Sequence, residues 1–178
     1  PPLRPCQLRE EVAAADDRPR DEVREEQDER QQPRQAPLGR DAAAVDRLAK
    51  AGVDCDFIVA DLTKDDAADA LVTETLSRAG RLDILVNNAG IAIHGDSGEF
   101  ADAIWREIMT VNVDAVFRAC RAALAPMRRQ GGGAILNIGS ISGIVSNIPQ
   151  NQVAYNASKA AVHMMTKSLA SEVAAENI

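Results

Sequence analysis

Three short apolar runs alternate with longer stretches of helical pattern in this chain. The runs span residues 57–60, 82–86 and 134–138, and polar or glycine-rich residues follow each of them. Continuous apolar runs of this length, rich in Val, Ile and Leu, are typical of strands that are buried on both faces. Strands that alternate with helices predict an α/β domain in which helices cover a parallel sheet.

Helical periodicity predicts the elements between the strands. The expected helices span residues 41–51, 65–79, 103–129 and 153–174. Asp41 is the expected N-cap of the first helix. Gly52, Gly80 and the glycines at 131–133 stand where three of the helices should end, as glycine does when a helix closes in a left-handed conformation.

The turns after the three apolar runs are candidates for a binding site. They begin at Asp61 and comprise residues 87–90 and 139–143, which read Asn-Asn-Ala-Gly and Gly-Ser-Ile-Ser-Gly. The carboxyl ends of parallel strands meet at one edge of a sheet, and ligands bind beyond that edge. The three turns are therefore expected to converge.

The last predicted helix carries a tyrosine and a lysine four residues apart, Tyr155 and Lys159. Residues at this spacing lie on one helix face, with Cβ atoms about 5–6 Å apart. A free phenol is a poor base at neutral pH, but a neighbouring cation favours the phenolate and makes the pair a proton acceptor and donor. The same spacing also arises by chance on many helices, so the pair alone does not identify an enzyme.

Charge and cysteine content exclude several classes of protein. The net charge of −7 argues against nucleic acid or an anionic membrane as a partner. The three cysteines, Cys6, Cys55 and Cys120, are far apart and have no metal-ligand spacing. Their odd number and the lack of a signal-peptide pattern predict a reducing, cytoplasmic location. No apolar run approaches the ~20 residues of a membrane span.

Residues 1–40 differ in composition from the rest. They are rich in Arg, Glu, Asp, Gln and Pro and have no sustained apolar stripe. The segment is predicted to be disordered, or a loose helix around residues 21–31, and to form no strand. An interaction tail and an aberrant sequence are alternative interpretations. The chain begins at Pro1 and ends at Ile178 directly after a helical pattern, so both ends are expected to be cut.

With these residues in place, residues 41–178 resemble a short-chain dehydrogenase/reductase. The resemblance rests on Asp61-Leu62, the Asn-Asn-Ala-Gly run at 87–90, Asn112, Ser140 and the Tyr155-x-x-x-Lys159 pair, which stand in the order of the family at near-family spacing. Each motif alone is common, whereas five in register are specific. The resemblance implies a Rossmann-like doubly wound parallel sheet, truncated at both ends. It also implies an NAD(P)-dependent oxidoreductase that transfers hydride between nicotinamide and an alcohol or ketone, and a homo-oligomer (a dimer or tetramer) if the full domain is present.

The family assigns catalytic roles to four of these positions. Tyr155 would exchange a proton with the substrate, and Lys159 would promote the phenolate and hold the cofactor ribose. Ser140 would steady the substrate oxygen, and Asn112 would bind a water molecule that relays protons to the lysine. Cofactor contacts are implied for Asp61, Leu62, Asn88, Ala89, Gly90, Tyr155 and Lys159. Asp61 is equally interpretable as a helix cap.

Ser142 competes with Ser140 for the catalytic role. Ser140 precedes Tyr155 by 15 residues and Ser142 precedes it by 13; the pattern favours Ser140 followed by a longer loop. Together with the Tyr-Asn-Ala-Ser-Lys run, this loop resembles family members that act on sugars, polyols and ketoses. The expected substrate contacts are Ser140, Ser142 and Tyr155. Gln150 and His94 offer further polar contacts, although His94 is also interpretable as an exposed loop residue and His163 as a packed helix residue.

The family's glycine-rich phosphate turn has no counterpart in this sequence. The only glycine before Gly52 is Gly39, and the run 131–133 closes a helix instead of opening one. Residues 41–178 are therefore expected to be a partial NAD(P)-binding domain. A non-catalytic fragment that associates through its helices is the alternative function. Arg40 stands where the family's second strand would end, and an arginine there favours NADP over NAD.

Overall fold

The computed structural model describes residues 39–178, apart from Asn147. The chain divides into two units, Pro1–Phe57 and Ile58–Ile178. The predictions for residues 1–38 lie outside the described residues.

In the first unit, α2 spans Gly39–Lys50, and Gly52 follows it with a φ of 80°. The predicted helix at 41–51 is confirmed, but Asp41 as its N-cap is wrong. The backbone is already helical two residues earlier, so Asp41 lies within the first turn. The backbone of Arg40 lies in that turn as well.

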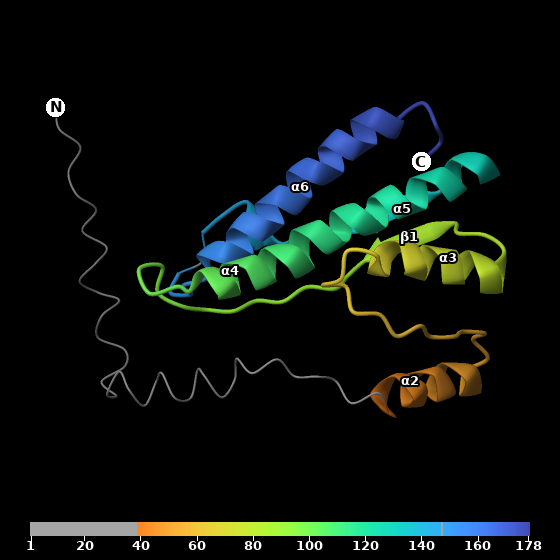
Figure 1. Cartoon of the computed structure of the whole chain (residues 1–178), viewed down its shortest axis with the longest axis horizontal. Coiled ribbons are helices and arrows are strands. Elements are labelled where there is room, and N and C mark those ends of the chain that lie inside the picture. Colours follow the sequence, from red (N-terminus) through yellow and green to blue (C-terminus); the bar gives the residue numbers. More distant parts are fainter. Residues whose placement is uncertain (1–38, 147) are drawn as a thin grey trace. The chain divides into compact units, whose positions relative to one another are not determined.

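The second unit contains one parallel sheet with the helices beside it (Figure 1). Its elements are α3 (Ala67–Ala79), β1 (Ile84–Asn87), α4 (Asp102–Met109), the π-helical turn η2 (Thr110–Asp114), α5 (Ala115–Gln130), β2 (Ala134–Asn137), the 3₁₀ turn η3 (Ile141–Gly143) and α6 (Val153–Val173). The strands pair in parallel, with Leu85 opposite Ile135 and Asn87 opposite Asn137. The predicted strands at 82–86 and 134–138 are thereby confirmed, although β1 begins two residues later than expected. No helix in the described part of the chain is both long and apolar enough to cross a bilayer.

The predicted strand at 57–60 is wrong. These residues have no regular secondary structure and belong to no ladder, and the described sheet contains β1 and β2 alone. Phe57 is 40% exposed and Val59 63% exposed. An apolar run forms a strand only when its backbone groups find a partner strand, and among the described residues this run has none.

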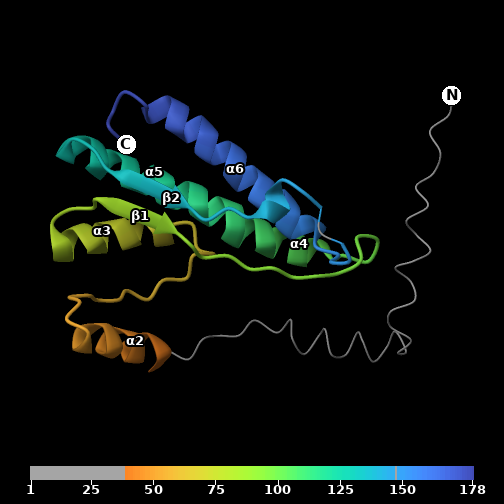
Figure 2. The ribbon, with the colours of Figure 1, turned by 180° about the vertical axis from the view of Figure 1, so that it is seen from behind.

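One face of the sheet packs against the helices. Figures 1 and 2 show the helices of this unit on one side of the strands. Asn87 on that face contacts Cys120 of α5, and Asn137 contacts Thr166 of α6. The fully buried core of this unit includes the side chains Ile108, Cys120, Met127 and Val162. On the opposite face, Ile84 (65%), Val86 (50%) and Leu136 (54%) are exposed within the described structure.

The predicted helix at 103–129 is continuous but irregular. It consists of α4, η2 and α5, and the π turn accommodates one extra residue in its middle. At its carboxyl end, Gln130 donates from Nε2 to the Leu82 carbonyl (2.6 Å) and accepts from the Leu82 N–H (3.3 Å), which holds the start of the β1 segment. Gly131 ends the helix with a φ of 87°, as predicted.

Gly143 allows η3 to lie directly on α6. A Cβ at Gly143 would come within 2.7 Å of the Lys159 carbonyl carbon and of the Ala160 nitrogen. These are backbone atoms in the middle of a helix, so they cannot move aside. The absence of a side chain at this one position therefore sets the distance between the turn after β2 and α6.

We expect Gly143→Ala to lower the free energy of unfolding by roughly 1–3 kcal/mol, because the added methyl group overpacks a rigid contact. Gly98→Ala is the matched control. Its Cβ would meet the exposed carboxylate of Asp96 at 3.2 Å, and we expect a change within about 0.5 kcal/mol. Chemical denaturation measures both; equal effects of the two substitutions would contradict this account of Gly143.

Candidate active site

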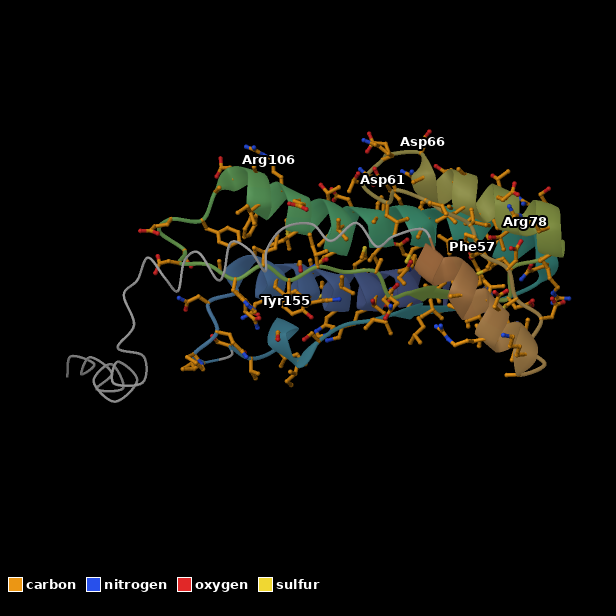
Figure 3. All side chains as sticks on the ribbon, turned by 90° about the horizontal axis from the view of Figure 1, so that it is seen from below. Phe57, Asp61, Asp66, Arg78, Arg106 and Tyr155 are labelled. Carbon is orange, nitrogen blue, oxygen red and sulfur yellow. The ribbon has the colours of Figure 1, made fainter. Side chains whose placement is uncertain are left out.

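The side chains of Tyr155 and Lys159 meet on one face of α6, as the spacing predicts. The Nζ atom of Lys159 lies 5.8 Å from the centre of the Tyr155 ring. Lys159 is only 5% exposed, and its Nζ donates to the Ile138 carbonyl just beyond β2 at 2.7 Å. Tyr155 is half-buried on α6 (Figure 3). The lysine thus joins the helix to the carboxyl end of a strand while placing its charge beside the phenol.

Asn112 links three segments through its side-chain amide. It is fully buried in η2. Its Oδ1 accepts from the Ile91 N–H at 2.8 Å, and its Nδ2 donates to the Ile91 carbonyl at 2.8 Å and to the Ser158 hydroxyl at 3.0 Å. Both backbone groups of Ile91 are therefore satisfied by one side chain. Asn112 fixes the loop after β1 against α6.

Gly90 lies where these two groups converge. A Cβ at this position would be 3.3 Å from Oδ1 of Asn112 and 3.6 Å from Nζ of Lys159. Asn88, Ala89 and Gly90 are themselves exposed. The Asn-Asn-Ala-Gly turn thus brings an open stretch of backbone to the buried amide and the buried ammonium.

Ser140 and Ser142 differ in their surroundings. Ser140 is half-buried, and its Oγ accepts from the Ser142 N–H at 3.1 Å. Ser142 is buried (7% exposed), and its Oγ accepts from Nε2 of Gln152 at 3.3 Å. Gln152 in turn contacts Nε2 of His94 through Oε1 at 3.0 Å. Ser142 therefore belongs to a hydrogen-bonded chain that joins η3 to the loop before α4.

Three residues of this site were missed or given another role by sequence reasoning. Gln152 joins Ser142 to His94, and Ser158 accepts from Asn112 while donating to the Tyr155 carbonyl at 2.7 Å. His163 accepts from the Ser140 N–H through Nε2 at 3.3 Å. The only available signal was for His163, which follows Tyr155 and Lys159 at four-residue steps. Gln150 is exposed, and within the described residues no hydrogen bond joins it to the site.

Asp61 and Leu62 lie apart from the phenol. Figure 3 shows Asp61 well separated from Tyr155. Oδ1 of Asp61 accepts from the Thr63 hydroxyl at 2.6 Å and from the Thr63 N–H at 3.0 Å, and these bonds hold the pKa of Asp61 below its usual value. The N-cap of α3 is Asp66. Asp61 therefore stabilises the turn at residues 61–63 and does not cap that helix. Leu62 lines an apolar hollow between α3, β1 and α5 together with Asn88 and Ala89.

A polar cluster holds the ends of the two strands together beneath the site. Asn87 donates from Nδ2 to Oδ1 of Asn137 at 2.8 Å and to Sγ of Cys120 at 3.4 Å. Asn137 donates to the Thr166 hydroxyl of α6 at 2.9 Å. Burial raises the pKa of the Cys120 thiol, and hydrogen bonds with Asn137 and Asn87 oppose this effect to a smaller extent.

Comparison with known proteins identifies the family to which this arrangement belongs. The family model described as short chain dehydrogenase matches residues 36–178. This chain belongs to the short-chain dehydrogenase family. The "Galactitol 2-dehydrogenase (L-tagatose-forming)" of Cereibacter sphaeroides is 45% identical over 143 residues, which cover 79% of this chain and 56% of that protein. The galactitol 2-dehydrogenase of Rhizobium johnstonii is 43% identical over 139 residues, covering 78% of this chain and 54% of that protein.

Solved structures also share the fold of this chain. A gluconate 5-dehydrogenase from Burkholderia cenocepacia J2315, solved with NADP and tartrate, superposes with a TM-score of 0.72 at 33% identity, covering 77% of this chain and 53% of that one. The α/β, Rossmann-type fold expected from the sequence is therefore confirmed. The chain spans about half the length of the relatives it matches.

The raised pKa of Cys120 predicts how stability and reactivity depend on pH. Folding favours the neutral thiol, so this contribution is complete below the thiol's ordinary pKa of about 8.5 and is lost as the pH rises through the raised value. We expect the unfolding free energy to fall as the pH rises above the ordinary thiol pKa of about 8.5, and to fall less in Cys120→Ala. We also expect iodoacetamide to modify Cys120 slowly until the chain is denatured, as mapped by mass spectrometry. Rapid alkylation of Cys120 in the native chain would contradict its burial.

Proposed function

We propose that this chain carries the proton-transfer centre of an NAD(P)-dependent oxidoreductase that interconverts an alcohol and a ketone. The observation that carries the proposal is the ammonium of Lys159, which is almost completely buried and lies 5.8 Å from the centre of the Tyr155 ring. A cation beside a phenol favours the phenolate. Tyr155 can then accept the proton of a substrate alcohol, or return one to the oxygen of a ketone.

The surroundings of Gly90 suit the ribose of a nicotinamide nucleotide. An ammonium has three N–H groups. Within the part of the chain that the structure describes, Lys159 gives one of them to the Ile138 carbonyl, and the other two would be available to ribose hydroxyls. The missing side chain at Gly90 keeps open the approach to Lys159 and Asn112. The nicotinamide, when bound, would exchange hydride with the substrate carbon. The proton is transferred by the chain's own residues.

Further cofactor contacts would lie along the apolar hollow between α3, β1 and α5. Asn88 and Ala89 would lie along the ribose, and Asp61 and Leu62 would contact the adenine; the hollow lined by Leu62, Asn88 and Ala89 supports this assignment. Arg40 favours NADP on grounds of charge. The solved relative that holds NADP supports a nicotinamide cofactor in general. Titration with NADH and with NADPH distinguishes the two cofactors.

The remaining groups would guide the substrate and the proton. Ser140 would donate its hydroxyl to the substrate oxygen and steady its developing charge. Asn112 gives both side-chain N–H groups to Ile91 and Ser158. A water molecule that relays protons to Lys159 would therefore bind at one of the oxygen atoms of Asn112.

A polyol or sugar is the proposed substrate class. The similarity to two galactitol 2-dehydrogenases supports it. The hydrogen-bonded chain of Ser142, Gln152 and His94 adjoins Ser140, and a substrate with several hydroxyl groups can use such polar groups where a plain ketone cannot.

An alternative function is a non-catalytic member of the family that associates through its helices. The observation in its favour is the sequence before Gly52, whose single glycine, Gly39, cannot form the turn that holds a pyrophosphate. Exposed apolar side chains on α4, α5 and α6 would supply the contact surface; they include Trp105 (39%), Phe117 (51%) and Met164 (61%).

The 178-residue chain is expected to bind NAD(P)H weakly and to show little or no turnover. Aligning the reactants can contribute ~7–11 kcal/mol, whereas general acid–base chemistry contributes ~10²–10⁴-fold in rate. The larger contribution depends on a phosphate-binding turn that this sequence lacks. Fluorescence titration with NADH and with NADPH, thermal shift, and an assay with galactitol measure these quantities. Robust turnover would show that residues 1–40 supply what the glycine turn supplies elsewhere.

A chimera tests the proton-transfer centre separately from the cofactor cradle. Residues 41–178 would replace the matching segment of the Cereibacter sphaeroides galactitol 2-dehydrogenase, which supplies the rest of the domain. We expect this chimera to oxidise polyols or reduce ketones. Tyr155→Phe should lower its turnover by about 10²-fold or more and leave the affinity for NAD(P)H nearly unchanged. Full activity of the Tyr155→Phe chimera would remove the basis of the proposed mechanism.

A further inference from the structure

His163 contacts the backbone of the turn that carries Ser140. Its Nε2 accepts from the Ser140 N–H at 3.3 Å. His163 follows Lys159 on α6 as Lys159 follows Tyr155, at steps of four residues, so the three side chains lie along one side of the helix. The helix that carries the phenol and the ammonium therefore also holds the turn that carries the serine hydroxyl.

A second observation places the imidazole directly on this turn. A Cβ at Gly139 would overlap Nε2 of His163 and would lie 2.7 Å from its Cδ2. The ring thus occupies the space that any side chain at Gly139 would need. His163 is itself half-buried. Its position is fixed by this packing as well as by one hydrogen bond.

The contact extends from the backbone of Ser140 to its hydroxyl group. Oγ of Ser140 accepts from the Ser142 N–H at 3.1 Å, and the Ser140 carbonyl accepts from the Gly143 N–H at 3.0 Å. We infer that His163 is a positioning residue, whose Nε2 fixes the Ser140 N–H and thereby holds the Ser140 hydroxyl at a set place relative to Tyr155. This inference rests on the proposed function for its catalytic meaning, but the hydrogen bond itself can be tested without turnover.

The role requires one chemical form of the histidine. Nε2 accepts a hydrogen bond only in the neutral ring that carries its proton on Nδ1, because a protonated Nε2 is a donor. A glutamine at this position can offer its amide oxygen as an acceptor near the place of Nε2. A leucine fills similar space and offers no acceptor. These two substitutions separate hydrogen bonding from packing.

Amide hydrogen exchange of the full 178-residue chain, read by NMR, tests the inference. In His163→Leu, exchange of the Ser140 and Ser142 amides should accelerate about tenfold relative to the Ile138 amide, which bonds to the Asn87 carbonyl and reports general stability; tenfold corresponds to about 1.4 kcal/mol. His163→Gln should restore both rates. Ser140→Ala should accelerate exchange of the Ser142 amide, and the backbone amide of position 140 should stay protected.

The ring nitrogens provide an independent measurement on the unmodified chain. Their ¹⁵N chemical shifts at neutral pH should show a neutral ring with its proton on Nδ1. A proton on Nε2 would overturn the inference, even if His163→Leu did not fold. It would equally be overturned if His163→Leu left the exchange of Ser140 unchanged, or if a folded His163→Gln failed to restore it. Lack of activity in the chimera would refute the proposed function and leave this hydrogen bond standing.

Discussion

The site depends on a lysine charge that has been taken out of water and that pairs with no carboxylate of the described residues. Burial of a charge is costly unless the charge is hydrogen-bonded or paired. Among the described residues, Lys159 has one hydrogen bond, to the Ile138 carbonyl, and the ring of Tyr155 nearby. A residue retained only for stability would serve better as an apolar side chain. Under the proposed function this cation serves the proton transfer at Tyr155, and it lies among α6, η3 and the end of β2.

The arrangement relies on backbone as much as on side chains. Asn112 bonds to both the N–H and the carbonyl of Ile91 and thereby holds the loop after β1. Gly143 leaves room for a turn to pack on α6, where a Cβ would clash, and Gly90 leaves open backbone beside a buried amide. Such contacts are short and rigid, and they constrain position more tightly than flexible surface pairs do.

Sequence patterns predicted the helices, their glycine ends, two of the three strands and the common face of Tyr155 and Lys159, because each of these follows from local periodicity. The segment 57–60 looked like a strand by composition, but strand formation also requires a partner that local sequence cannot reveal. The contacts of Gln152 and His163 were not predictable, because they join a helix to turns that meet it only in the folded chain. The π-helical hydrogen bonding around Asn112 likewise could not be predicted from composition.

The π turn at Thr110–Asp114 sets the rotation of α4 relative to α5 about their common helix axis. Each residue advances an α-helix by about 100°, so removing one residue here would give a more regular helix and rotate one half of it against the other. Asn112 would then no longer face both Ile91 and Ser158. The chain keeps a locally imperfect helix because two different faces of it must be aimed at once.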